Sequence, residues 1–317
     1  MSMDFEIICT NCRAPLVVKE GGEAFCCTAC GRHYPVDNGV IRFLEQDDEF
    51  YEGTYENHIR FIPRSERLWH IWPLWLINSG YLWAVRRHVP AGSTVVELGC
   101  AGGVRYFGAR YRMIGCDLSF SALLKLDNVY KARLQVDASS CLPLPDNSVD
   151  AVVSSYFWEH IPPVVKPQIL AEINRILRPG GKLIFLYDVE TENPLIRHYR
   201  KIDRDLYDRL FIEGDGHLGY QRSLVNISIF KEAGFRLVKH QGMEKTWLQS
   251  PSAYTKLAQF GAGSPLLAGF VRQVQNPPWS HLYTALLRLT DSLVSHWLPK
   301  TWARIDLAVF EKYLLYK

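Results

Sequence analysis

Short apolar runs alternate with longer amphipathic stretches over residues 92–240 of this chain. The runs are apolar at consecutive positions rather than at every second one, which is typical of strands buried on both faces of a parallel sheet. Between two of them, Pro167–Leu177 repeats its Ile and Leu residues at helical spacing and stops at a Pro-Gly-Gly. The pattern predicts an α/β fold with helices on both faces of a parallel sheet. Five strands are expected within 93–99, 111–117, 132–137, 149–155 and 181–188.

Two further strands are predicted nearer the C-terminus, at 235–241 and 311–317. The helical segment that separates them has one apolar face over residues 281–297, made of Leu282, Leu286, Leu289, Leu293 and Trp297. That face has three possible uses. It covers an apolar acceptor as a lid, it packs the helical extensions on each other, or it makes a peripheral contact with a membrane.

The N-terminal part has a different pattern. Residues 1–45 contain short apolar strands separated by turns at Gly21-Gly22 and Asn38-Gly39. Residues 46–91 begin acidic and become rich in aromatic residues. We therefore divide the chain into a small unit at 1–45, an aromatic-rich linker and helical cap at 46–91, a core at 92–246, and a helical insertion with a final strand at 247–317.

Composition and charge narrow the function classes. The 317 residues carry 36 basic and 33 acidic side chains, a net charge of +3, and residues 1–45 are net acidic, so we expect no nucleic-acid partner from charge alone. Residues 68–85 have no formal charge, but Pro73 and Gly80 interrupt them, which favours short helices over a membrane span. The start of the chain lacks the pattern of a secretory signal, and we expect a cytoplasmic protein.

Five of the eight cysteines fall in the first 30 residues. Two Cys-x-x-Cys pairs, Cys9 with Cys12 and Cys27 with Cys30, provide four thiolates at the spacing of a structural zinc site. Cys26 and His33 are alternative ligands, because Cys26 with Cys30 or Cys30 with His33 could also hold a metal. A unit of this size has too small a core to fold alone, so bound Zn²⁺ would supply its folding energy.

The segment CTNCRAPL, followed by CTACGRHYPVDNGVIRFL, resembles the zinc-ribbon domain related to the activator subunit of tRNA and release-factor methyltransferases. The resemblance covers about residues 5–45. It implies a structural Zn²⁺ ion held by Cys9, Cys12, Cys27 and Cys30.

An apolar strand in TVVELGCAGG ends in a glycine-rich turn. A dinucleotide-binding turn would need glycines at 99, 101 and 104, but the chain has Ala101 and Val104, which disfavours NAD or FAD. Asp117 ends the next predicted strand, where a carboxylate can accept hydrogen bonds from both ribose hydroxyls of a nucleotide. The alternative for Asp117 is a helix N-cap before Ser119.

This turn resembles the first motif of class I S-adenosylmethionine-dependent methyltransferases, with Ala101 in place of a usual glycine, and the core resembles the ubiquinone/menaquinone-biosynthesis type. LPLPDNSVDAVV and INRILRPGGKLIF extend the match over about 92–190. The resemblance implies a Rossmann-like, seven-stranded sheet and S-adenosyl-L-methionine as cosubstrate. It also implies that Asp137 binds the adenine amino group. The implied cofactor-binding residues are Glu97, Gly99, Cys100, Ala101, Gly103, Asp117, Leu118, Asp137, Ala138 and Tyr156.

Two histidines are candidate catalytic residues. His160 follows the fourth strand and His217 precedes a late helix, both in regions that approach the acceptor pocket in methyltransferases of this type. Either could act as a general base if the acceptor must lose a proton. The alternative is that these histidines cap a helix or pack against neighbouring side chains.

We therefore expect an enzyme that methylates a small, apolar or aromatic metabolite by in-line transfer. One alternative is a zinc-ribbon RNA methyltransferase. A second is a non-enzymatic, cofactor-binding interaction module.

Overall fold

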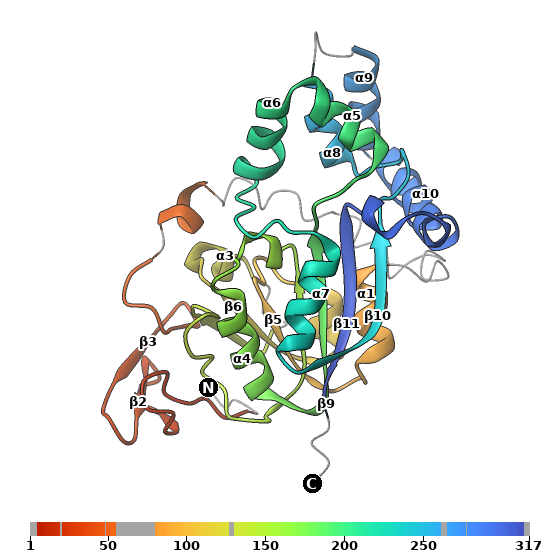
Figure 1. Cartoon of the computed structure of the whole chain (residues 1–317). Coiled ribbons are helices and arrows are strands. Elements are labelled where there is room, and N and C mark those ends of the chain that lie inside the picture. The colour runs from red at the N-terminus through yellow and green to blue at the C-terminus, as the bar shows by residue number, and fades with distance from the viewer. Residues whose placement is uncertain are drawn as a thin grey trace.

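The structure is a computed structural model that describes residues 5–19, 21–47, 49–54, 80–126, 130–260, 265–276 and 278–313. Its centre is a twisted sheet with the strand order β7-β6-β5-β8-β9-β11-β10 (Figure 1). The strands are β5 (Thr94–Leu98), β6 (Arg112–Asp117), β7 (Ala132–Gln135), β8 (Val149–Ser155), β9 (Leu177–Asp188), β10 (Phe235–Met243) and β11 (Ile305–Lys312). Strands β5 to β9 are parallel to one another, and β11 runs antiparallel between β9 and β10.

Six of the seven strands lie where the sequence predicts them. The prediction for the seventh was wrong, because β11 begins at Ile305 rather than at Glu311, and residues 314–317 lie outside the described part. β11 pairs along its whole length with both β9 and β10, so it needs a continuous buried run. IDLAVF provides that run, since Ile305 to Phe310 are all buried.

Helices cover both faces of the sheet, as the alternation predicts. On one face α1 (Tyr81–His88), α2 (Arg105–Arg110) and α3 (Phe120–Lys125) pack against side chains such as Val95. On the other face α4 (Lys166–Ile176) and α7 (Ser223–Glu232) pack against side chains such as Val96. Successive residues of one strand thus enter two different cores, which is why the strands read as unbroken apolar runs.

The N-terminal unit extends this sheet at its edge. Its strands β1 (Leu16–Val18), β2 (Ala24–Cys27), β3 (His33–Asp37) and β4 (Val40–Arg42) form an antiparallel meander. β4 then pairs in parallel with β7, with Ile41 opposite Leu134 and Arg42 opposite Gln135. This pairing covers the backbone of β7, which would otherwise be an exposed edge strand.

A third core belongs to a layer of helices at the end of the sheet where β9 leads into α5 (Figure 1). The layer consists of α5 (Pro194–Ile202), α6 (Arg204–Asp208), α8 (Pro251–Leu257), α9 (Pro265–Val274) and α10 (Trp279–Leu293). Its buried side chains include Ile196, Tyr207, Leu257 and Leu287. Short helical turns at Phe50–Thr54, Trp158–His160, Arg209–Glu213, Ser295–Trp297 and Lys300–Trp302 complete the described elements.

Among the described residues, no helix has the length and apolar character needed to cross a membrane. The uncharged stretch 68–85 is described only from Gly80, where α1 follows. The rest of that stretch lies outside the described residues.

Candidate functional site

The four expected zinc ligands lie together in the N-terminal unit. The Sγ atoms of Cys9, Cys12, Cys27 and Cys30 are all within 4.8 Å of one another. Cys9 Sγ lies 3.6 Å from Cys30 Sγ, and Cys12 Sγ lies 3.3 Å from Cys27 Sγ. A tetrahedral Zn²⁺ with bonds of about 2.3 Å separates its sulfur ligands by about 3.8 Å, so this cluster fits the ion closely.

Backbone and side-chain donors point at these sulfurs. Ala29 N and Cys30 N both donate to Cys27 Sγ, at 3.4 and 3.3 Å. Burial opposes ionisation of Cys9, but hydrogen bonds from the Tyr34 hydroxyl and nearby backbone N–H groups lower the pKa of its thiol to about 6. These donors favour the thiolate form that a metal requires.

The alternative ligands Cys26 and His33 point away from the cluster. Cys26 Sγ lies 3.1 Å from His33 Nδ1, and the two residues are partners across β2 and β3. Successive residues of a strand face opposite sides, so Cys27 and Cys26 cannot both face the same metal. The geometry therefore favours the symmetric set of four cysteines.

The glycine-rich loop lies between the carboxyl ends of β5 and β6. Gly99, Ala101 and Gly103 all have positive φ, of 61°, 41° and 66°. A Cβ at Gly99 would lie 2.8 Å from the Phe157 ring, and one at Gly103 would lie 2.1 Å from Leu126, so neither position has room for a side chain. Cys100 is buried inside the loop, with its pKa raised by burial, which makes it a packing residue.

Glu97, in β5, stabilises the glycine-rich loop through hydrogen bonds. It is 2% exposed, and its carboxylate accepts hydrogen bonds from the Tyr130 hydroxyl and, at 3.4 Å, from the Tyr81 hydroxyl. Tyr130 Oη in turn accepts the N–H of Val104 at 2.9 Å. The acidic residue of the motif thus connects β5, through Tyr130, to Val104 at the far end of the loop.

Asp117, at the end of β6, also binds the glycine-rich loop. Its Oδ2 accepts the N–H of Ala101 at 2.8 Å, and its Oδ1 accepts the N–H of Ser119 at 3.0 Å. The helix cap proposed for Asp117 belongs instead to Ser119, whose hydroxyl accepts the N–H of Ala122. Burial raises the pKa of Asp117, while the backbone N–H donors act in the opposite direction. Each carboxylate oxygen keeps a lone pair that a ribose hydroxyl can use.

Asp137 follows β7, the strand beside β6. Its carboxylate accepts the N–H and the hydroxyl of Ser139, both at 2.8 Å, and the next residue, Ala138, is buried. The carbonyl of Leu118 accepts Gln135 Nε2 at 3.1 Å, which ties the two strand ends together. The residues predicted to bind ribose and adenine therefore lie at neighbouring strand ends.

The carboxyl end of β8 bends sharply at Tyr156. This residue has a φ of 55°, an unusual value for a bulky side chain, and its ring is 43% exposed. Trp158 is instead buried, with its indole N–H donating to Asn226 at 3.0 Å. Tyr156 is thus available to a ligand, whereas Trp158 is part of the core.

His160 and His217 come together although they are far apart in sequence. Their rings lie 5.2 Å apart, and His160 Nδ1 lies 3.1 Å from the carbonyl oxygen of Gly216. His217 Nε2 lies 3.9 Å from carboxylate oxygens of both Asp188 and Asp215. Burial lowers the pKa of His217 to about 3, against the opposing charge of Asp215, so its imidazole is neutral at physiological pH.

Sequence analysis missed several residues of this region. Glu159 and Asp188 lie beside the two histidines, and the N–H of Asp188 donates to Glu159 Oε1 at 3.2 Å. Asp188 ends β9 and could have been found by the rule used for Asp117. Glu52 accepts the N–H of Ser121 at 3.2 Å, at the start of α3, and nothing in the sequence indicates that contact.

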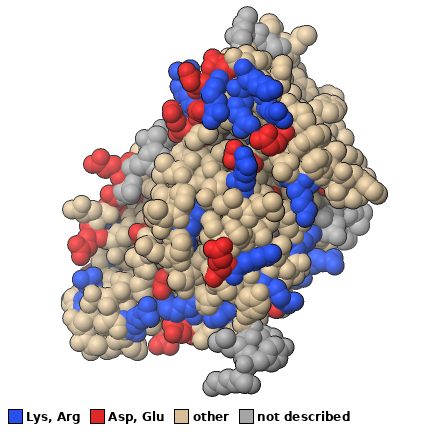
Figure 2. All heavy atoms as spheres, viewed as in Figure 1, with Lys and Arg blue, Asp and Glu red and all other residues tan. Residues whose placement is uncertain are grey.

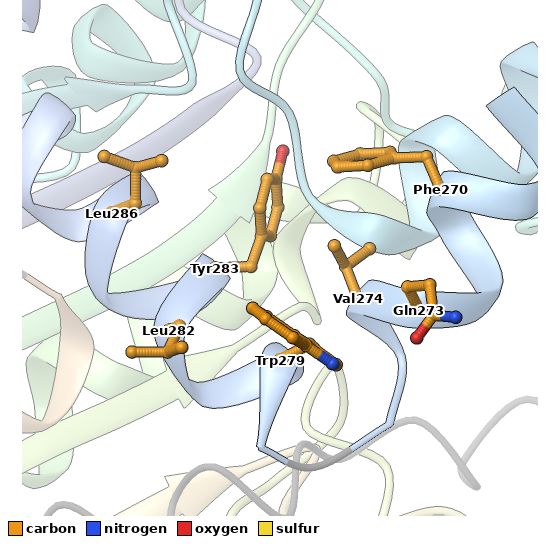
Figure 3. Close-up of a pocket in the computed structure, with 7 residues that line it drawn as sticks. All are labelled: Phe270, Gln273, Val274, Trp279, Leu282, Tyr283 and Leu286. Carbon is orange, nitrogen blue, oxygen red and sulfur yellow. The ribbon is translucent and has the colours of Figure 1, made fainter. Parts of the chain in front are cut away.

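An apolar groove lies apart from these strand ends, between α9 and α10 (Figure 3). Its volume is about 510 Å³. It is lined by Phe270, Gln273, Val274, Trp279, Leu282, Tyr283 and Leu286.

Comparison with known proteins identifies a matching family. Residues 96–185 match the family described as "Methyltransferase domain". The chain is 32% identical over 142 residues to the tRNA (carboxymethyluridine(34)-5-O)-methyltransferase ALKBH8 of Macaca fascicularis, covering 43% of this chain and 21% of that protein. It is 26% identical over 181 residues to the demethylmenaquinone methyltransferase of Lactiplantibacillus plantarum, covering 49% of this chain and 75% of that protein. The chain thus spans only about a fifth of the first of these relatives.

A solved structure has a similar fold. The phosphoethanolamine N-methyltransferase 2 of Haemonchus contortus, in complex with S-adenosyl-L-methionine, superposes with a TM-score of 0.51 at 16% identity. The match covers 86% of this chain and 61% of that one.

Proposed function

Given that the chain carries a class I methyltransferase domain, we propose that it transfers a methyl group from S-adenosylmethionine to a small apolar or aromatic acceptor. One observation carries this proposal. The Asp117 carboxylate accepts the N–H of Ala101 and so holds the glycine-rich loop at the end of β5. A loop fixed in this way brings a close-approaching backbone and a ribose-binding carboxylate to one place, as a nucleoside ligand requires.

The residues of the site fit S-adenosylmethionine. Gly99 and Gly103 leave the backbone free of side chains, and Asp117 and Asp137 offer acceptors for ribose and adenine. The cosubstrate supplies a methyl group already activated on a sulfonium. This chain therefore has to align the acceptor and exclude water, and a base is needed only if the acceptor loses a proton. His160 and His217 lie next to each other in this region, but the pKa of about 3 makes the His217 imidazole a weak base.

An apolar acceptor is supported by one comparison. The relative in Lactiplantibacillus plantarum is named for a quinone substrate. A quinone favours an acceptor with a large apolar surface.

An RNA acceptor is the alternative, because another relative is named a tRNA methyltransferase. The ion pairs of this region do not favour it. Basic side chains gather at the top of the view in Figure 2, with acidic ones beside them. On α5 and α6, Arg200 pairs with Glu192 and Arg204 pairs with Asp208. A backbone-binding surface instead needs basic residues that are left available for phosphates.

The first prediction tests cofactor binding. Asp117→Ala removes both the ribose acceptor and the anchor of the loop, so we expect S-adenosylmethionine to bind about tenfold to hundredfold more weakly, since each charged hydrogen bond contributes about 1.5–3 kcal/mol. Isothermal calorimetry measures the dissociation constant. Asp205→Asn, an exposed acidic residue in α6, is the matched control. An unchanged affinity in Asp117→Ala would contradict the assignment of Asp117 as a cofactor-binding residue. A wild type that binds no S-adenosylmethionine would contradict the proposed function.

A further inference from the structure

Glu159, His160 and His217 form a second cluster of metal-ligating side chains, far along the chain from the cysteines. One ligand atom from each lies within 4.8 Å of the others, and all three residues are buried or nearly so. Two histidines and one carboxylate are a common donor set for divalent transition metals in proteins.

Two atoms of the cluster lack hydrogen-bond partners among the residues that the structure describes. They are Glu159 Oε2 and His217 Nδ1, on side chains that are 1% and 8% exposed. A buried polar atom without a partner costs about 1–3 kcal/mol, so such atoms need an explanation. Both belong to the same cluster, where one bound cation would satisfy them together.

Within the described residues Glu159 forms no ion pair, and the charge of Lys166 acts on it only from a greater distance. The two other carboxylates nearby do form one, because Asp188 lies 3.3 Å from Arg304 and Asp215 pairs with Lys256. Lys166 donates instead to the oxygens of Gly219, Gln221 and Asn226, at 2.8 to 3.0 Å. A carboxylate buried without a cation is unfavourable unless it is protonated or binds a metal.

The surroundings orient both imidazoles. The contact of His160 Nδ1 with the Gly216 carbonyl makes this nitrogen the donor and leaves Nε2 as the nitrogen that carries the lone pair. A hydrogen bond of this kind on the second nitrogen is typical of metal-ligating histidines. His217 has Nε2 toward Asp188 and Asp215 and stacks on Tyr220, with ring centroids 5.3 Å apart.

The two loops that carry the cluster are tied to each other. The N–H of Gly219 donates to the carbonyl oxygen of Glu159 at 2.8 Å. A Cβ at Gly219 would lie only 1.9 Å from the carbonyl oxygen of Ile161, so the two backbones are in direct contact. A four-ligand zinc site spaces its nitrogen ligands by about 3.4 Å, and small side-chain rotations would bring the three atoms to that spacing.

We propose that Glu159, His160 and His217 bind a divalent transition-metal ion at the acceptor side of the site, separate from the zinc of the ribbon. Three protein ligands leave at least one coordination position for another molecule. Glu159 and His160 follow β8 shortly after Tyr156, next to the glycine-rich loop. The open position then selects an acceptor that bears a hydroxyl oxygen able to bind the metal, a conclusion that rests on the proposed function.

The experiment uses the whole 317-residue chain with one equivalent of Zn²⁺ added for the four-cysteine site. Co²⁺ is then added, and binding is followed by calorimetry and visible absorption. We expect one further ion per chain, bound by nitrogen and oxygen ligands. Glu159→Gln and His217→Gln should each weaken this binding at least tenfold, whereas His198→Gln, an exposed histidine in α5, should not.

The wild type decides the question even if a variant fails to fold, which circular dichroism would reveal. A zinc-loaded wild type that takes up no further Co²⁺ overturns the proposal and indicates a protonated Glu159. The same holds if folded variants bind Co²⁺ as tightly as the wild type. S-adenosylmethionine titrated into the same samples separates the two claims. If the protein binds S-adenosylmethionine but no second metal, only the proposed metal site is wrong. If it binds the second metal but no S-adenosylmethionine, the proposed function is wrong.

Discussion

At the scale of single residues, the structure explains how Ala101 can occupy a position where the family motif usually has glycine. Ala101 takes a φ of 41°, where an L-residue other than glycine is strained by about 1–2 kcal/mol. Its N–H donates to Asp117 Oδ2 at 2.8 Å, a charge-assisted hydrogen bond that offsets a cost of this size. The carboxylate expected to bind ribose therefore also keeps the loop in its strained form.

The cysteines give a prediction at the same scale. Cys9→Ser should release zinc, because it removes a ligand whose sulfur lies 3.6 Å from Cys30 Sγ and accepts from Tyr34. Cys26→Ser should keep the metal, since Cys26 faces His33 instead. Elemental analysis of the purified proteins measures the zinc content. Loss of zinc in Cys26→Ser, with retention in Cys9→Ser, would reverse the assignment of ligands.

How far the sequence predicts single site residues depends on where their partners lie. Asp117 and Asp137 could be identified because each follows an apolar run, and the ends of parallel strands meet at one edge. Tyr130 could not, because its role depends on a contact with Glu97 in another strand. The same applies to Glu159, whose lack of a partner is visible only when the surrounding loops are placed.

At the scale of elements, α10 is apolar on more than one side. The leucines predicted to share a face do so, but that face is exposed, with Leu286 48% exposed. The side that packs into the helical layer carries Tyr283 and Leu287. Periodicity identifies the faces of a helix, but it does not say which one meets the protein when both are apolar.

This orientation predicts a contrast between adjacent leucines. Leu287→Ala should lower the free energy of unfolding by about 2–5 kcal/mol, because Leu287 is 6% exposed and its removal leaves a cavity. Leu286→Ala should change it by about 0.5 kcal/mol or less, since its side chain is largely exposed. Urea denaturation of both variants provides the measurement. A larger loss in Leu286→Ala would mean that the outward face is the one that packs.

The strands also show where prediction from the hydrophobic pattern succeeds and where it fails. Runs such as TVVEL and AVVSS were placed correctly because a strand buried on both faces must be apolar throughout. The last strand was misplaced because Arg304 and Asp306 interrupt the apolar pattern at its start. In the structure Arg304 is satisfied by Glu244 and Asp188, and the run begins there.

At the scale of the whole molecule, the sheet is longer than the core that the sequence predicts. The pairing of β4 with β7 joins the ribbon strands to those of the methyltransferase domain. The family resemblance implies a seven-stranded sheet, but it does not imply this junction, which pairs residues 41–42 with residues 134–135. Pairing between segments so distant leaves no local signal in either one.

The junction predicts that zinc removal lowers the protection of a core strand, β7. Chelation of the ribbon metal should unfold β4 and expose β7, so backbone amides of Ala132–Gln135 should exchange with deuterium faster, while those of β9 should not change. Hydrogen–deuterium exchange with mass spectrometry measures both segments in one experiment. Equal protection of β7 with and without zinc would show that β7 does not depend on the ribbon for its protection.

The same junction bears on how the chain is made. The ribbon is synthesised before the methyltransferase domain, so its four cysteines are available to metal before most of that domain has been translated. Until Ala132–Gln135 leave the ribosome, β4 offers an unpaired strand edge. A ribbon loaded with metal at that stage would be a template on which the later-made edge strand of the core sheet assembles.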